Sequence, residues 1–221
     1  HHVFETAAPT TCPGNPDAIG VSRVMKVDTD GGFYVGQTYH TRIPLQPKEV
    51  VLTFDDGPMT GRTERVLSAL DHECTKATFF IVGQMAKAYP ETLRKTAAAG
   101  HTIGSHTWSH VNLAIKPLAE ATAEIEKGIS GVVMAAGQPT APFFRFPQLR
   151  QTAELKAHLG ERNIATFSID IDSEDFRIHK PEQLVTSVMT KLKKTGKGII
   201  LMHDFQKSTA LALPEILSQL K

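Results

Sequence analysis

The sequence has almost no net charge and no long apolar segment. Lys and Arg number 24 against 23 Asp and Glu, which gives a formal net charge of +1 at pH 7. This balance gives no electrostatic reason to expect nucleic acid or an anionic membrane as the main partner. The longest uninterrupted apolar run covers only residues 132–136, whereas a bilayer-spanning helix needs roughly 18 apolar residues or more. We therefore expect neither nucleic-acid binding nor a transmembrane helix.

Cysteine is also scarce. The chain has 2 cysteines, Cys12 and Cys74, and their wide separation differs from the close spacing of a zinc knuckle or a redox pair. Two interpretations stay open: one disulfide formed in an oxidising compartment, or two buried thiols. The first residues have neither the basic region nor the apolar stretch of a secretory signal. We expect no signal peptide in this chain, and its start therefore says nothing about export.

Hydrophobic residues make up 41% of the 221 residues, enough for a substantial core and too many for a disordered chain. This length predicts one large domain, or one domain with an extension. Residues 1–46 are densely punctuated by proline and glycine, which predicts an extended N-terminal arm with one hairpin around residues 30–32. Near residue 47 the sequence pattern changes to short apolar runs that alternate with segments of helical periodicity, and we expect the folded domain to cover residues 47–221.

Within this domain, short apolar runs alternate with segments of helical periodicity. The runs predict strands at residues 50–54, 77–82, 101–105, 143–146, 164–169 and 198–202. The periodic segments predict helices at residues 63–72, 90–99, 118–136, 152–159, 182–192 and 209–220. Alternation of this kind predicts an α/β fold with a parallel sheet covered on both faces, either open and doubly wound or closed into a barrel.

Nearly every predicted strand ends in ionisable side chains, which core packing alone does not require. In chain order these are Asp55, Asp56, His106, His110, Arg145, Asp170, Asp172, Asp175, His203 and Asp204. Functional side chains in parallel α/β proteins collect at the carboxyl ends of strands and in the loops that follow them. We therefore expect one functional site at this edge of the sheet.

A metal ion gives several of these residues a chemical task. His106 and His110 are four residues apart, so on a helical turn both imidazoles project from one face and reach one ion. A carboxylate from another strand supplies a third ligand, and zinc with three protein ligands keeps the open position of a catalytic site. Asp55 and Asp56 are adjacent, which lets one bind metal while the other accepts a proton from water.

Five segments in this order carry a resemblance to a known family. They are residues 53–58 (TFDDGP), 105–110 (SHTWSH), 145–147 (RFP), 172–176 (DSEDF) and 201–203 (LMH). Together they closely resemble the motifs of the polysaccharide deacetylases of carbohydrate esterase family four, the NodB-like domain, over roughly residues 48–221. The resemblance implies a distorted parallel (β/α) barrel of about seven strands. Because the sequence shows six clear strands and ends after its last helix, we expect a barrel that is incomplete at the C-terminal end or closed differently.

The resemblance also implies a metal centre and two proton carriers. Asp56, His106 and His110 would hold a divalent ion, usually zinc and sometimes another transition metal such as Co²⁺. Asp55 would be the general base that takes a proton from water, and His203 would be the general acid that protonates the departing amine.

Two further residues would orient these proton carriers. By the resemblance, Arg145 would pair with Asp55, and Asp175 would pair with His203. A charged partner on each proton-transfer residue fixes its geometry and biases its pKa.

The expected substrate contacts include two departures from the family pattern. Leu201 and Trp108 resemble walls of the groove that accepts the acetyl methyl. Gln148 stands where the family usually has Tyr, and it keeps the backbone N–H that helps to stabilise the oxyanion. Phe176 stands where the family usually has Trp, and it keeps an apolar wall without the indole donor. Both departures affect substrate preference more than activity.

The resemblance implies hydrolysis of N-acetyl groups on amino sugars of a polysaccharide or oligosaccharide, such as chitin-like or peptidoglycan glycans. An acetylated glycan would be the partner. Alternatives that stay open are removal of O-acetyl groups, as from xylan, opening of a small cyclic amide, and a carbohydrate-binding protein that has lost turnover. A two-His-one-carboxylate iron oxygenase shares the ligand types, but the Asp–Asp pair and the remote His203 favour hydrolysis. A bond between the two cysteines would favour an extracytoplasmic location.

Overall fold

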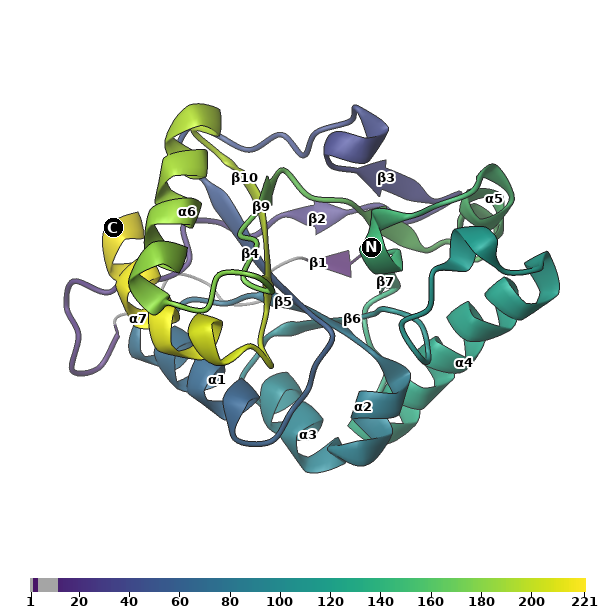
Figure 1. The fold of residues 1–221 in the computed structure, drawn as a ribbon, viewed down its shortest axis with the longest axis horizontal. Coiled ribbons are helices and arrows are strands. Elements are labelled where there is room, and N and C mark those ends of the chain that lie inside the picture. The colour runs from purple at the N-terminus through teal and green to yellow at the C-terminus, as the bar shows by residue number, and fades with distance from the viewer. Residues whose placement is uncertain (1, 4–11) are drawn as a thin grey trace.

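Eight parallel strands form one curled sheet in the computed structural model, which describes residues 2–3 and 12–221 (Figure 1). The strands are β3 (Phe33–Val35), β4 (Val50–Asp55), β5 (Thr78–Ile81), β6 (Thr102–Ser105), β7 (Phe143–Phe144), β8 (Ala165–Phe167), β9 (Ile171–Asp172) and β10 (Gly198–His203). Their order across the sheet is β3-β8-β7-β6-β5-β4-β10-β9. Since β3 and β9 are the two edges, the sheet is a half-barrel, and the predicted distorted (β/α) barrel is confirmed with eight strands instead of about seven.

Within the described residues, seven α-helices cover the outside of the half-barrel (Figure 1). They are α1 (Arg62–His72), α2 (Gly83–Ala88), α3 (Pro90–Ala98), α4 (Leu118–Ala136), α5 (Ala153–Glu161), α6 (Pro181–Thr195) and α7 (Lys207–Leu220). Their buried residues follow helical spacing, as in α4, where Ala121, Ile125, Gly128, Val132 and Ala136 form one stripe. None of the helices within residues 12–221 combines the length and the apolar character that crossing a bilayer demands.

The two longest strands, β4 and β10, pair with each other near the β9 edge of the sheet. Both are apolar along almost their whole length, as strands buried on both faces of a parallel sheet are. Their register runs from Gly198 opposite Val50 to His203 opposite Asp55. The pairing therefore places an acidic and an imidazole side chain next to each other at the carboxyl edge of the sheet.

The N-terminal segment lies against the inner face of the half-barrel. Val35, Ile43 and Leu45 share one buried cluster with Phe80 and Phe167 of the sheet. β2 (Lys26–Val27) pairs antiparallel with β1 (His2–Val3), while β3 pairs with β8. The predicted hairpin around residues 30–32 is therefore wrong, because the two strands that flank that turn find partners elsewhere. The division of the chain at residue 46 stays a prediction.

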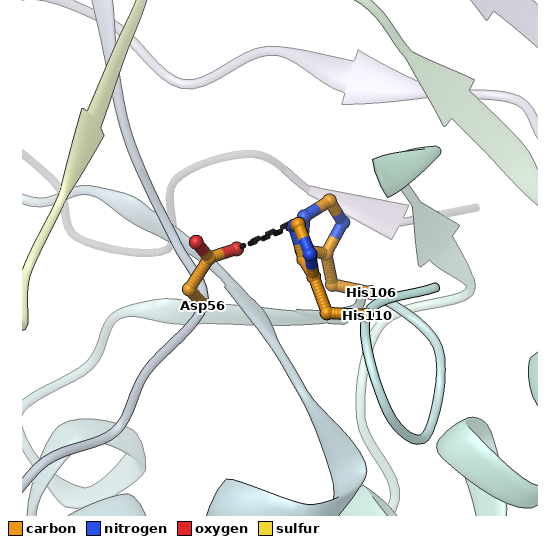
Figure 2. A group of neighbouring side chains, drawn as sticks. All are labelled: Asp56, His106 and His110. Carbon is orange, nitrogen blue, oxygen red and sulfur yellow. Dashed lines mark ion pairs between the residues drawn. The ribbon is translucent and has the colours of Figure 1, made fainter. Parts of the chain in front are cut away.

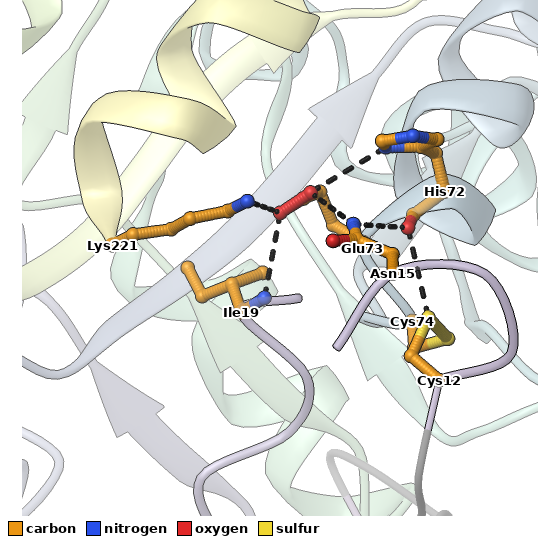
Figure 3. Close-up of a disulfide and its surroundings, with 7 residues drawn as sticks. All are labelled: Cys12, Asn15, Ile19, His72, Glu73, Cys74 and Lys221. Carbon is orange, nitrogen blue, oxygen red and sulfur yellow. Dashed lines mark hydrogen bonds and ion pairs between the residues drawn. A yellow bond between two sulfur atoms is a disulfide. The ribbon is translucent and has the colours of Figure 1, made fainter. Parts of the chain in front are cut away.

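A disulfide joins Cys12 to Cys74 and ties the N-terminal segment to the end of α1 (Figure 3). Beside it, the buried Glu73 carboxylate accepts hydrogen bonds from Asn15 Nδ2 at 2.9 Å and from the backbone N–H of Ile19 at 3.4 Å. Lys221 Nζ lies 2.8 Å from the same carboxylate. Of the two interpretations of the cysteines, the structure supports the disulfide.

Candidate active site

The turn after β4 separates two neighbouring carboxylates. Asp55 is the last residue of the strand, and Asp56 has a φ of 79°, in the left-handed region that few residues other than glycine adopt. The backbone N–H of Asp56 donates to the carbonyl oxygen of Phe80 at 3.2 Å. Because of this turn, adjacent side chains point to different partners, so one carboxylate is available for a metal and the other for a proton.

Asp56 faces two imidazoles (Figure 2). Its Oδ1 lies 3.2 Å from Nε2 of His106 and 3.1 Å from Nε2 of His110. The segment from His106 to His110 follows β6 as a loop, with Thr107 at a φ of 69° and His110 at 58°. The predicted helical turn is therefore wrong, although the two rings still meet with their centroids 4.9 Å apart. The hydroxyl of Thr107 stabilises the loop by accepting a hydrogen bond from the backbone N–H of His110 at 3.0 Å.

The chemistry of this triad fits a divalent cation. His106 Nδ1 lies 2.6 Å from the carbonyl oxygen of Arg145, and because a carbonyl only accepts, Nδ1 carries the hydrogen of the neutral ring. The lone pair of Nε2 then points at Asp56, whose buried Oδ1 has no hydrogen-bond partner among the described residues. Acceptors that face one another in this way need a cation between them. Two imidazole nitrogens and one carboxylate oxygen, all within 4.8 Å of one another, form a zinc-type ligand set.

When the facing imidazoles are protonated and no cation is bound, they and the Asp56 carboxylate stabilise each other's charges. Burial raises the pKa of Asp56, but the two facing imidazoles outweigh burial and hold that pKa below its ordinary value. The same carboxylate raises the pKa of His110. Asp56 is therefore ionised at neutral pH, as a metal ligand must be.

Asp55 is held by a fully buried arginine. Arg145 Nη1 lies 2.8 Å from Asp55 Oδ1 and donates a second hydrogen bond to Thr53 Oγ1 at 2.8 Å. Its Nε and Nη2 donate to the carbonyl oxygens of Phe167 and Ser168 at 3.2 and 3.1 Å. With four hydrogen bonds, the guanidinium is held in place and its buried charge is paired with Asp55.

The second carboxylate oxygen of Asp55 faces the triad. Asp55 Oδ2 lies 3.7 Å from His106 Nε2, while Oδ1 is engaged by Arg145. Asp55 therefore has one oxygen held by Arg145 and one oxygen that faces His106 of the triad.

His203, at the end of the neighbouring strand β10, also faces the triad. Its Nδ1 lies 2.7 Å from Asp175 Oδ1, and its backbone N–H donates to Asp175 Oδ2 at 2.6 Å. Thr209 Oγ1 also donates to Oδ2 at 2.5 Å. Burial lowers the pKa of His203, but the hydrogen bond and charge of Asp175, with Asp56 and Asp55, raise it to about 9. Nε2 of His203, 3.6 Å from Asp56 Oδ2, therefore carries a proton at neutral pH.

These groups open into one cavity of about 360 Å³. Its lining consists of Asp55, Asp56, His106, His110, Phe146, Gln148, Leu149, Asp172, Phe176, Leu201 and His203. Phe176 is 54% exposed at the rim, whereas Leu201 is buried. Gln148 and Leu149 both adopt left-handed backbone conformations, with φ of 56° and 57°. The cavity thus combines a charged floor with apolar walls, the usual composition of a small-ligand site.

Trp108 does not line this cavity, although the sequence predicts it as a groove wall. Its ring lies against Gly83 of α2 and Gly131 of α4, where a Cβ on either glycine would clash with it. Lys127 of α4 lies over the same ring, with its Nζ 4.3 Å from the centroid of the Trp108 ring. The absence of two side chains creates a slot between the helices, and the indole fills it instead of the groove.

Three lining residues were not among the expected site residues. Phe146 and Asp172 belong to segments with recognised motifs, and only their position beside the triad distinguishes them from core and loop residues. Leu149 reaches the cavity because its backbone is left-handed. A leucine gives no sign of this conformation in the sequence, whereas a glycine would. Asp170, by contrast, accepts the backbone N–H of Ile199 at 2.8 Å, near the opposite end of β10.

A parallel half-barrel with an Asp-His-His triad at its carboxyl edge defines the class of the protein. The sequence matches the family Polysaccharide deacetylase over residues 42–166. The chain belongs to this family, which is carbohydrate esterase family four with its NodB domain. The family and the fold predicted from the sequence are therefore confirmed.

Characterised relatives share both sequence and fold. The peptidoglycan-N-acetylglucosamine deacetylase PgdA of Listeria monocytogenes is 29% identical over 98% of this chain and 46% of its own length. The peptidoglycan deacetylase Bd3279 of Bdellovibrio bacteriovorus superposes with a TM-score of 0.81, at 35% identity over 91% of this chain and 55% of that chain. A family 4 carbohydrate esterase from Streptomyces lividans gives 0.70, at 30% identity over 78% and 87%. The chain thus spans about half the length of the first two relatives.

Proposed function

We propose that this chain is a metal-dependent deacetylase that hydrolyses N-acetyl groups on the amino sugars of a glycan such as peptidoglycan or chitin. The observation that carries the proposal is the placement of an anchored carboxylate, Asp55, and a protonated imidazole, His203, next to one metal-type triad. The names of PgdA and Bd3279 support peptidoglycan as the substrate class.

Asp56, His106 and His110 would hold the cation. When bound, a divalent cation such as zinc or Co²⁺ supplies Lewis-acid chemistry that activates water and polarises a carbonyl. Asp55 Oδ2 accepts the proton of the attacking water while Arg145 holds Oδ1 in place.

The leaving group receives its proton from His203. His203 donates its Nε2 proton to the amide nitrogen as the carbon–nitrogen bond breaks, and Asp175 keeps the ring oriented through Nδ1. The backbone N–H of Gln148 is assigned to the oxyanion, and Leu201 and Phe176 are assigned to the acetyl and sugar walls. The products are acetate and the free amine of the sugar.

Measuring acetate release tests this function. Protein reconstituted with zinc is incubated with chitooligosaccharides, peptidoglycan and acetylated xylan, and each reaction is repeated after removal of metal with a chelator. We expect metal-dependent release from an N-acetylated glycan. Release from xylan alone would establish the O-acetyl esterase instead, and glycan binding without release would establish a carbohydrate-binding protein.

The location and the domain division complete the proposal. The disulfide between Cys12 and Cys74 persists in oxidising compartments, and a peptidoglycan or chitin substrate lies outside the cytoplasm. We therefore assign the protein to an extracytoplasmic compartment. Residues 47–221 would be the catalytic domain, and residues 1–46 an extension that the disulfide fastens to it and that adds β3 to its sheet.

A further inference from the structure

A second group of buried polar side chains lies directly behind the turn that carries Asp56. Asp204 follows His203 at the end of β10 and is 0% exposed. Its Oδ2 accepts a hydrogen bond from Thr63 Oγ1 at 2.6 Å, and its Oδ1 has no hydrogen-bond partner among the described residues. Neither Asp204 nor Thr63 lines the cavity. Asp204 is therefore a buried carboxyl group next to the site that has no role in the proposed chemistry.

Thr63 connects this carboxyl group to the turn. The backbone N–H of Met59 donates to Thr63 Oγ1 at 2.9 Å. Since the hydroxyl has a single hydrogen and already accepts one bond, that hydrogen goes to Asp204. A second link runs in parallel, because Arg62 Nη1 donates to the carbonyl oxygen of Phe205 at 2.8 Å. The start of α1 is thus tied to the loop that follows β10.

Gly57 shows how closely the turn rests on Asp204. A Cβ added to Gly57 would lie 2.8 Å from Cγ of Asp204 and closer still to both carboxylate oxygens. On its other side, the turn is fixed to β5 and its end, where Asp56 N donates to Phe80 O and Val82 N donates to Gly57 O, both at 3.2 Å. The turn is therefore clamped between the ends of β5 and β10, the two strands that flank β4.

A turn of this kind needs such support. The left-handed backbone of a residue other than glycine is sparsely populated and persists only where the surroundings impose it. In Asp56 that conformation directs the carboxylate at the two imidazoles. We propose that Asp204 and Thr63 are positioning residues that hold the turn of residues 56–59 so that Asp56 is presented as a metal ligand. This inference rests on the proposed function and adds two residues to its machinery.

Zinc affinity of the purified full chain, measured by competition with a chromophoric chelator, tests the inference without any substrate. The substitutions Thr63→Val and Asp204→Ala remove the clamp, and we expect zinc to bind about tenfold or more weakly to each, as typically follows loss of a group that orients a ligand. Thr63→Ser and Asp204→Asn keep a hydroxyl and an acceptor of similar shape, so we expect both to stay within about threefold of wild type.

Thr96→Val is a matched control for Thr63→Val. Thr96 is a buried helical threonine of α3 whose hydroxyl donates to Thr92 O at 2.9 Å, so its substitution removes the same atom from the core without touching the turn. We expect its zinc affinity to equal that of wild type. Circular dichroism verifies that each variant is folded, and if Asp204→Ala does not fold, the pair Thr63→Val and Thr63→Ser decides the question.

Wild-type zinc affinity in folded Thr63→Val would overturn the inference. So would an Asp204→Asn variant as weak as Thr63→Val, because the effect would then come from charge instead of position. A wild-type chain that binds zinc but releases no acetate from any glycan contradicts only the proposed function. A wild-type chain that binds no zinc contradicts both.

Discussion

Arg145 contacts His106 through its backbone and Asp55 through its side chain. Its carbonyl oxygen lies 2.6 Å from His106 Nδ1, and its guanidinium Nη1 lies 2.8 Å from Asp55 Oδ1. One residue therefore orients both the proposed metal ligand His106 and the proposed general base Asp55. Because the two contacts use different atoms, a side-chain substitution separates them.

Arg145→Lys is expected to lower kcat while leaving zinc affinity close to that of wild type. The carbonyl that orients His106 remains, but an ammonium cannot reproduce the planar set of donors that holds Asp55, Thr53 and two carbonyls. We expect a loss of about tenfold to a hundredfold in kcat, part of the total contribution of a general base. Zinc affinity and acetate release measured on the same preparation check this. A parallel fall in zinc affinity would show that the side chain also maintains the triad.

Asp55→Asn and Asp56→Asn should differ although the residues are neighbours. Asp56 offers its oxygen to both imidazoles, so its amide variant is expected to lose zinc affinity. Asp55 faces the site as a proton acceptor, so its amide variant should keep the metal and lose about a hundredfold to ten-thousandfold in rate. Chelator competition and acetate release distinguish the two effects. Equal loss of zinc by both variants would show that Asp55 is a ligand, contrary to its proposed role.

The main features of the site could be predicted from the sequence because they depend on local patterns. Apolar runs ending in Asp55, His106 and His203 place these residues at the carboxyl edge of any parallel sheet, and the strand register then brings them together. The alternation of strands and helices predicted the α/β class for the same reason. Two strands escaped prediction: β9 has no apolar run, and β3 has a run of only three residues within a glycine-rich segment.

Other features depend on contacts between distant residues and left no signal in the sequence. Trp108 occupies a slot formed by Gly83 and Gly131, which belong to two different helices. The bend at Thr107 that brings the imidazoles together is a left-handed conformation with no glycine to mark it. The close approach of Asp204 to Gly57 joins residues that lie near opposite ends of the domain in sequence. The catalytic roles assigned to the site residues stay predictions until the variants are measured.

Removing the disulfide should lower stability without changing the rate of the reaction. Cys12 and Cys74 are separated by 62 positions, and a cross-link of that length typically contributes about 2–4 kcal/mol to the free energy of unfolding. Cys74 lies next to the C-terminal end of α1, whereas the triad lies at the carboxyl edge of the sheet. Urea unfolding of the Cys12→Ser, Cys74→Ser double variant checks stability, with wild type in reductant as its control. A fall in kcat at a temperature where the variant is folded would show that the N-terminal segment contributes to the site.

The pH dependence of stability should report the burial of Asp204. Burial raises its pKa to about 7, against an ordinary value of 3.8, so between these values the folded state binds a proton that the unfolded state has released. The contribution of this carboxyl group to stability is therefore fully present below about pH 4 and is lost as the pH rises through about 7. Asp204→Asn removes the titration, so the stability of the variant relative to wild type should increase across this interval. Urea unfolding of both proteins in chelator at a series of pH values measures the difference. Asp170→Asn, at a partly exposed carboxylate near the opposite end of β10, is the control. A difference between Asp204→Asn and wild type that does not change with pH would show that the buried carboxyl group does not titrate in this range.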